Sequence, residues 1–162
     1  MIPESKREGA QLSIVESFIG PEKKRKPRAS PSVGAKAWIV AVSEVNVMMV
    51  SGEWENASAV HFVALYAILH QRVYGVDVAE LNVARERTIA KFAAYRMLTN
   101  EFSGNVDSMV TFIKWCWLRE QKSVTWRRNN PERDNGFRIG WKYQFNGKLL
   151  SDWRMMCTRG TG

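Results

Sequence analysis

The sequence predicts an α+β fold in which a body of three to four helices is followed by a C-terminal β-hairpin. Three observations predict it. Apolar residues recur at helical spacing over residues 57–122, they alternate with polar residues over 137–145, and the first 35 residues mix Lys, Arg, Pro, Ser and Gly. We therefore expect a flexible basic arm at residues 1–35 and one domain at residues 36–162, a length that suits a single core.

Within the predicted arm, Pro21, Pro27 and Pro31 prevent a long helix. A brief apolar interval over residues 12–19 is expected to form at most a short helical turn or docking segment. A basic run follows, and we expect it to contact phosphates, with a solvated tail or a nuclear import signal as alternatives. Its cations are Lys23, Lys24, Arg25, Lys26 and Arg28.

Residues 37–50 are rich in β-branched side chains but long for a strand, so helix and strand compete there. We favour a buried helix that ends at Ser51-Gly52.

Three further helices are predicted with clearer ends. The first runs over residues 57–74, capped by Asn56 and ended by Gly75. The second runs over about residues 77–101, since Asp77 and Glu80 have the spacing of a capping box. The third begins at Asn105 or Asp107 and ends near Lys122.

Residues 124–136 are polar and contain Pro131 and Gly136, so they predict a loop. The alternating residues 137–145 then predict a strand that turns at Asn146-Gly147 and pairs with residues 148–156. A short helix over 148–156 is the alternative, because that segment alternates poorly. Three helices followed by a basic hairpin have the element order of a winged helix-turn-helix, an analogy of fold alone, and the length of the second helix counts against it.

The formal net charge of +8 lies at the two ends of the chain. Residues 110–162 hold 11 Lys and Arg against 4 Asp and Glu, whereas residues 36–109 hold 6 against 8. A nearly neutral body with basic ends indicates a polyanionic partner, and we expect nucleic acid, DNA in preference to RNA. The C-terminal residues expected to contact it are Lys114, Arg119, Lys122, Arg127, Arg128, Arg133, Arg138, Lys142 and Arg154.

Tryptophan and arginine are interleaved in the same region, as in Trp126-Arg127-Arg128 and Trp153-Arg154. If exposed, such pairs suit stacking on unpaired bases. If buried, they form a tryptophan-rich core covered by cationic side-chain stems, which is the commoner case for any one tryptophan.

No enzymatic signature is evident, so we predict a non-enzymatic protein with no cofactor and no metal. His61 and His70 are nine residues apart and lie on opposite sides of a helix, and the two cysteines form no Cys-x-x-Cys pair. Glu120-Gln121-Lys122 has the Glu-x-Lys form of some metal-dependent nucleases, but this tripeptide is common by chance.

The absence of a long apolar run and of a secretory signal pattern predicts no membrane association and an intracellular location, cytoplasmic or nucleoid-associated, or nuclear in a eukaryote. The rival to nucleic-acid binding is a structural or adaptor subunit of a larger assembly, such as a viral particle or a replication complex. In that case, residues 37–50 and exposed tryptophans would contact protein partners or a second copy of the chain.

Overall fold

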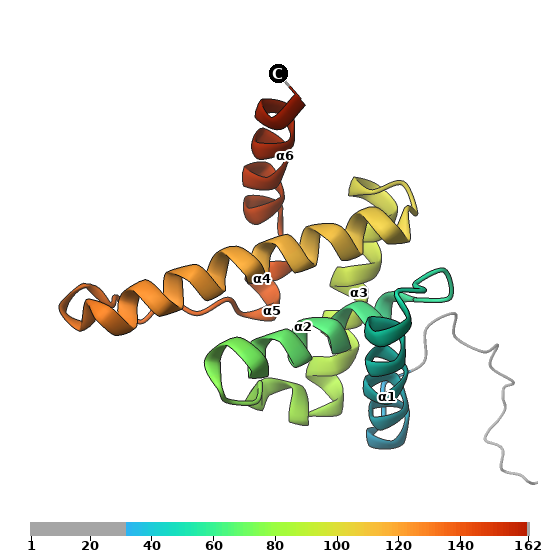
Figure 1. Cartoon of the computed structure of the whole chain (residues 1–162). Helices are drawn as coiled ribbons and strands as arrows, with labels where there is room; N and C mark the ends of the chain where they lie inside the picture. Colours follow the sequence, from blue (N-terminus) through green and yellow to red (C-terminus); the bar gives the residue numbers. More distant parts are fainter. Residues whose placement is uncertain (1–31, 162) are drawn as a thin grey trace, which may run out of the picture. The chain divides into compact units, whose positions relative to one another are not determined.

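The computed structural model describes residues 32–161, and every regular element in this range is helical (Figure 1). The predicted arm therefore falls, apart from its last few positions, outside the described residues, as do Lys23, Lys24, Arg25, Lys26 and Arg28. The elements are α1 (Ala35–Ser51), α2 (Ala59–Tyr74), the 3-10 turn η2 (Ala79–Asn82), α3 (Ala84–Glu101), α4 (Val106–Asn129), the 3-10 turn η3 (Pro131–Arg133), α5 (Trp141–Gln144) and α6 (Gly147–Thr161).

The predicted α+β class is wrong, because residues 32–161 contain no β-strand. The analogy with a winged helix is wrong for the same reason: the hairpin that would form the wing is replaced by α5 and α6.

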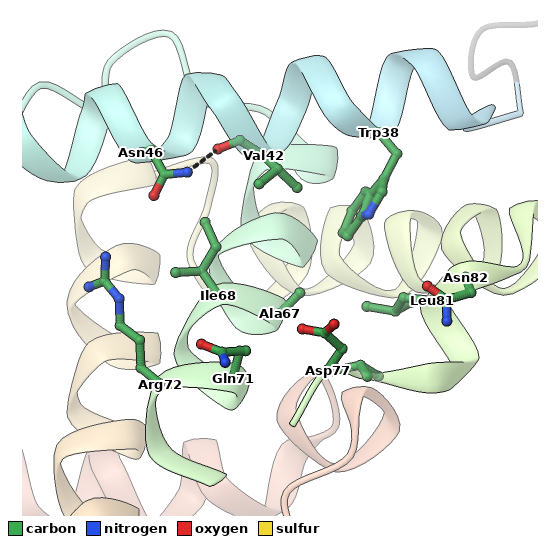
Figure 2. Close-up of a pocket in the computed structure, with 11 residues that line it drawn as sticks. Trp38, Val42, Asn46, Ala67, Ile68, Gln71, Arg72, Asp77, Leu81 and Asn82 are labelled. Atoms are coloured by element: carbon green, nitrogen blue, oxygen red, sulfur yellow. Dashed lines mark hydrogen bonds between the residues drawn. The ribbon is translucent and has the colours of Figure 1, made fainter. Parts of the chain in front are cut away.

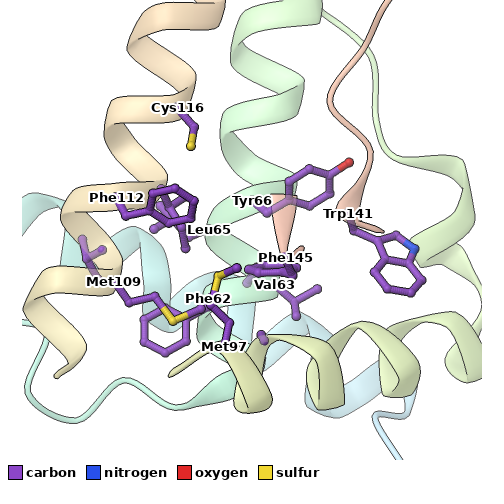
Figure 3. Packing of buried hydrophobic residues seen from close by; sticks show 14 of the residues in the cluster. Phe62, Val63, Leu65, Tyr66, Met97, Met109, Phe112, Cys116, Trp141 and Phe145 are labelled. Atoms are coloured by element: carbon purple, nitrogen blue, oxygen red, sulfur yellow. The ribbon is translucent and has the colours of Figure 1, made fainter. Parts of the chain in front are cut away.

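Helix α2 supplies the centre of the hydrophobic core. Five consecutive residues, Phe62 to Tyr66, are fully buried, which requires neighbours on every side of the helix. Helices α1, α3, α4 and α5 provide those neighbours. Figure 3 shows the buried side chains that surround α2, among them Met97, Met109, Phe112, Trp141 and Phe145.

Helix α1 confirms the helical alternative for residues 37–50. Gly52 ends it as predicted, with a φ of 75° and its N–H donating to the carbonyl of Met48 at 2.7 Å. The expected burial is wrong for one face, since Ala41 and Val45 are the only fully buried residues of the helix.

The inward face of α1 packs on α2. Trp38 and Val42 point from α1 toward Ala67 and Ile68 of α2, beside a groove of about 450 Å³ (Figure 2). The opposite face exposes large aliphatic side chains to solvent. Among the described residues, no helix is both long and apolar enough to cross a bilayer.

Helix α2 begins at Ala59, two residues later than predicted, because Ser58 and not Asn56 caps it. The N–H of Ser58 donates to Nδ1 of His61 at 2.9 Å. The Ser58 side chain in turn lies against the backbone of His61, the third residue of the helix, which completes a capping box. The predicted end is confirmed: Gly75 has a φ of 79°, and its N–H donates to the carbonyl of Gln71.

The capping box predicted at Asp77 is wrong, and the helix starts seven residues later, at Ala84. The chain first makes the single turn η2 and an extended residue, Val83. A buried arginine stabilises this arrangement, because Arg87 donates to the carbonyls of Leu81 at 2.8 Å and Val33 at 3.1 Å. The bond to Leu81 satisfies a carbonyl that a continuous helix would have used, and the bond to Val33 links this turn to the residues before α1.

Helix α4 starts where predicted but is longer than predicted. The side chain of Asn105 accepts from the N–H of Ser108 at 3.0 Å and caps the helix. The helix then continues to Asn129, so the predicted loop over residues 124–136 is wrong for residues 124–129. Val124 packs against the core, and Pro131 ends the helix because the residue before a proline disfavours helical backbone.

Residues 141–144 and 147–156 form helices, and residues 137–140 are irregular, because burial does not follow the predicted alternation. Trp141, Gln144 and Phe145 are buried, and the two aromatic residues are four apart on one helical turn. The side chain of Asn146 accepts from the N–H of Lys148 at 2.8 Å, which caps α6, and Gly147 lacks the positive φ that a tight hairpin turn needs. The alternative of a helix over 148–156 is thus confirmed.

Candidate nucleic-acid interface

A cleft of about 600 Å³ lies between the C-terminal half of α4 and the segment that follows it. Beyond η3 the chain runs back along α4 toward α5 (Figure 1). We call this hollow the basic cleft; it is lined by Arg119, Glu120, Lys122, Ser123, Trp126, Arg127, Arg133, Asn135 and Phe137.

Two tyrosines of α2 hold the returning segment in place. The Tyr74 hydroxyl accepts from the N–H of Ile139 at 2.8 Å and donates to Oε2 of Glu120 at 2.6 Å. The Tyr66 hydroxyl donates to the carbonyl of Ile139 at 2.9 Å. Both backbone groups of Ile139 are therefore satisfied by side chains, and the wall of the cleft is anchored without a β-ladder.

The floor of the cleft contains an ion pair between Glu120 and Arg127. Nη2 of Arg127 lies 2.9 Å from Oε2 of Glu120, and the two side chains are only 12% and 7% exposed for Arg127 and Glu120, respectively. Nε of Arg127 also lies 3.6 Å from Oδ1 of Asp134. Arg127 is thus engaged inside the protein, and this geometry gives it a structural role in holding α4 to the returning segment.

Asp134 organises the rim of the cleft. Its side chain accepts from the N–H of Gly136 at 2.8 Å, and Gly136 has a φ of 77°, a conformation that favours glycine. The hydrogen bond from Gly136 lowers the pKa of Asp134, and the positive charges of Arg138 and Arg127 lower it further. Arg138 lies 3.7 Å from Asp134 and over the ring of Tyr74, so it too is partly engaged.

Three predicted contact residues near the cleft are exposed and unpaired. Lys122, Arg128 and Arg133 make no ion pair with any other described residue. Lys122 and Arg133 line the cleft, whereas Arg128 lies on α4 outside it. Arg119 also lines the cleft, but it stacks on Trp115 with 4.5 Å to the ring centroid and approaches Asp152 at 3.5 Å.

Two exposed aromatic side chains share the cleft with these cations. Trp126 is 49% exposed and Phe137 is 37% exposed. Trp126 and Lys122 also line a second hollow, of about 460 Å³, on the other side of this stretch of α4. The indole therefore stands on a ridge between two hollows, with a cation one helical turn away.

The remaining predicted contact residues do not join this surface. Lys114 lies over the ring of Trp54, at 5.4 Å from its centroid, and Lys142 lies over that of Trp141, at 5.5 Å. Arg154 forms an ion pair with Glu101 at 3.2 Å and donates to its carbonyl. The structure thus brings Arg119, Lys122, Arg127 and Arg133 together and distributes the others.

Five lining residues of the basic cleft are not among the predicted contacts: Glu120, Ser123, Trp126, Asn135 and Phe137. Of these, Trp126 belongs to the interleaved tryptophan and arginine pattern of the sequence. The signal that identifies it is its position one turn after Lys122, which is visible only if the helix is known to extend past residue 124.

Residues considered for catalysis have structural partners. Glu120 is occupied by Tyr74 and Arg127, so the Glu-x-Lys tripeptide presents no free carboxylate. Nε2 of His61 lies 2.8 Å from Glu44, and Nδ1 of His70 donates to the carbonyl of Val76. Within residues 32–161, no three His, Cys, Asp or Glu side chains are grouped to hold a metal ion.

Tyr66, which is buried, and Tyr74, which is partly buried, predict a loss of stability at alkaline pH. Burial raises the pKa of both Tyr66 and Tyr74 well above 10, and the bond to Glu120 raises that of Tyr74 further. Each tyrosine ionises in the unfolded state above pH 10 but stays protonated in the folded state. The stability it contributes is thus complete below pH 10 and falls by about 1.4 kcal/mol per pH unit above it.

Denaturant unfolding at pH 9, 10 and 11 measures this slope. Tyr74→Phe should remove the contribution of Tyr74 and so reduce the loss of unfolding free energy per pH unit. Tyr95→Phe, a change at an exposed site on α3, should leave this loss unaltered. Equal slopes for the parent chain and Tyr74→Phe would contradict the prediction.

Comparison of the chain with protein-family models, with curated proteins and with solved structures found no match.

Proposed function

We propose that this protein binds nucleic acid without catalysing a reaction on it, and that unpaired nucleotides occupy the basic cleft. One observation carries the proposal: exposed Trp126 and Phe137 line the same cleft as the unpaired cations Lys122 and Arg133. Aromatic faces stack on bases, and the cations neutralise phosphates.

Stacking requires bases that are not already paired, which favours single strands, loops or ends over an intact duplex. The returning segment also offers Asn135, and α4 offers Ser123, whose side chains are of types that bind base edges. Lys122, Arg128 and Arg133 are assigned to phosphates, and Arg127 is assigned to the support of the cleft. The basic run of residues 23–28 adds non-specific affinity in this proposal.

Salt dependence of binding tests the phosphate contacts. With three contacts on a single strand, the cleft cations should contribute about −2 to the slope of log affinity against log salt, from ~0.7 per phosphate, in addition to the contribution of the basic run. The double change Lys122→Ala and Arg133→Ala should make the slope of the parent chain shallower by about 1.4. Fluorescence anisotropy of labelled single-stranded DNA, single-stranded RNA and duplex DNA, from about 50 mM salt upward, gives all these slopes.

A matched control removes the same charge elsewhere. Arg85→Ala with Arg96→Ala changes two exposed arginines of α3 that line no part of the cleft, and its slope should equal that of the parent chain. If the control flattens the slope as much as the cleft variant, the binding site lies elsewhere. No binding to any of the three nucleic acids at about 50 mM salt would reject the function itself.

One observation favours the adaptor function as a second candidate: the outward face of α1 exposes apolar residues of the 37–50 segment. The tryptophans contribute less than the sequence suggested, because Trp54 is buried and Trp38 packs against the core. An assembly role would thus rest on aliphatic side chains of α1.

A further inference from the structure

Helix α1 has a second apolar face that points away from the core. Ile39, Val40, Val47 and Val50 expose between 47% and 91% of their surfaces. They follow one another at spacings of one, seven and three residues, which places all four within a sector of about 100° on one side of the helix, with the small residue Ser43 among them. We call this stripe the outer α1 face.

The outer α1 face is not needed for the fold of the described domain. The opposite side of the helix already packs on α2 through Trp38 and Val42, as Figure 2 shows, and it carries the two fully buried residues. Large aliphatic side chains in an exposed stripe are costly to leave in water, and a stripe with this spacing is the pattern by which two helices pack together.

The charges at the two ends of the outer α1 face are of opposite sign. Lys36 lies at its N-terminal end. Its C-terminal end borders a hollow of about 360 Å³ that is lined by three glutamates, Glu44, Glu53 and Glu55, together with Val47. Lys36, Glu53 and Glu55 are exposed and make no ion pair with other described residues.

We propose that the outer α1 face binds the same face of a second copy of the chain, with the two helices antiparallel and Ser43 near the two-fold axis. In this arrangement, Lys36 of each copy approaches the acidic hollow of the other, and the apolar stripes cover each other. A parallel pair would place like charges together at both ends, so charge complementarity selects the antiparallel one.

The size of the face sets the strength of the dimer. Four aliphatic side chains with these exposures present on the order of 400 Å² of apolar surface per copy, which is below the ~800 Å² per partner of a standard stable interface. The helix of 17 residues is about 26 Å long, so flanking residues of the hollow add to the contact. We therefore expect reversible dimers with a dissociation constant in the micromolar range.

Sedimentation equilibrium of the full chain, from about 1 to 200 μM, tests the proposal. The average mass should rise from one chain toward two as concentration increases. Val47→Glu should weaken the dimer by about tenfold or more, because it buries an unpaired charge in the contact. Leu118→Glu, on an exposed site of α4 outside the face, should not. A chain that is monomeric over the whole range would overturn the proposal, including the case in which residues 1–31 cover the face.

Disulfide trapping tests the orientation independently of stability. In a background of Cys157→Ser, which leaves only the buried Cys116, Ser43→Cys should form an intermolecular disulfide readily, since the two copies of residue 43 meet at the axis. Val50→Cys should not pair with itself but should pair with Lys36→Cys on a second chain. Efficient self-pairing of Val50→Cys, or none for Ser43→Cys, would overturn the antiparallel dimer.

Charge reversal adds a rescue. Lys36→Glu should weaken self-association, and a variant with both Glu53→Lys and Glu55→Lys should do the same. A mixture of the two should recover association, because the glutamate introduced in the first variant then meets the basic hollow of the second. Failure of the mixture to associate more tightly than either variant alone would reject the proposed charge pairing. All these measurements are made without nucleic acid, so their outcome is separate from that of the proposed function.

Discussion

Arg127→Met is expected to lower the free energy of unfolding by about 3 kcal/mol or more. Arg127 and Glu120 form a pair in which both side chains are nearly buried, at 2.9 Å. Removing the arginine leaves the Glu120 carboxylate in the protein interior with only the Tyr74 hydroxyl as a hydrogen-bond donor. Desolvation of an unpaired charge is the reason for so large an effect, and methionine retains much of the side-chain volume.

Chemical denaturation with urea measures the change, and Arg128→Met is the control. Arg128 is the next residue on the same helix and is exposed without an ion pair among the described residues, so its replacement should change stability by no more than about 0.5 kcal/mol. Equal effects of the two substitutions would show that the buried pair does not stabilise the fold as we infer.

The same variant tests how the cleft is supported. Arg127 links α4 to Asp134 at the rim, so its loss should increase hydrogen exchange in residues 131–139 before other parts of the domain. Nucleic-acid binding should weaken as well, although Arg127 is not assigned to a phosphate. The salt slope should stay near that of the parent chain, because the number of phosphate contacts is unaltered.

Trp126→Ala is expected to weaken binding of single-stranded nucleic acid by about 1 to 3 kcal/mol, or roughly 5- to 150-fold in affinity. The indole is half exposed and shares its cleft with Lys122 and Arg133, so a base that stacks on it can keep its phosphate near a cation. Trp126→Phe should retain part of the affinity, because a smaller aromatic face still stacks.

Two comparisons separate stacking from a general loss of structure. Affinity for duplex DNA should change by less than about 0.5 kcal/mol in Trp126→Ala, since paired bases do not reach the indole. Leu118→Ala, which removes another exposed side chain of α4, should leave both affinities unchanged. A loss of affinity that is equal for single strands and duplexes would remove the assignment of Trp126 to unpaired bases.

Several helix ends follow from the sequence because their causes are local. Gly52 and Gly75 end their helices in the left-handed conformation, and Asn105 caps α4 through its own side chain. Each signal acts within about four residues, so a single sequence contains it completely. The two wrong predictions, a helix start at Asp77 and a loop from residue 124, have causes that are not local. Arg87 bonds to Val33, which is distant in the sequence, and Arg127 pairs with Glu120 in a nearly buried position.

The candidate site was predictable in composition but not in arrangement. A surplus of cations among residues 110–162 is a property of the sequence, and it identifies the third of the chain that contains the basic cleft. Burial then separated those cations into Arg127, which is internal, and Lys122 and Arg133, which face the cleft. Periodicity contains no information on which cation finds a carboxylate partner across the fold.

Local signals in the sequence were sufficient to predict the helix of residues 57–74, the start of α4 at Asn105, the terminators Gly52 and Gly75 and the basic charge of the C-terminal third. Packing determines that residues 141–144 and 147–156 are helical, because Trp141 and Phe145 reach the core from one turn and Asn146 caps α6. It also decided that α1 is apolar on two faces of which one is buried. The physical reason is the same in both cases. Alternation and apolar runs in a sequence identify the side chains that gain from burial, whereas the packing of neighbouring helices determines which of them are buried.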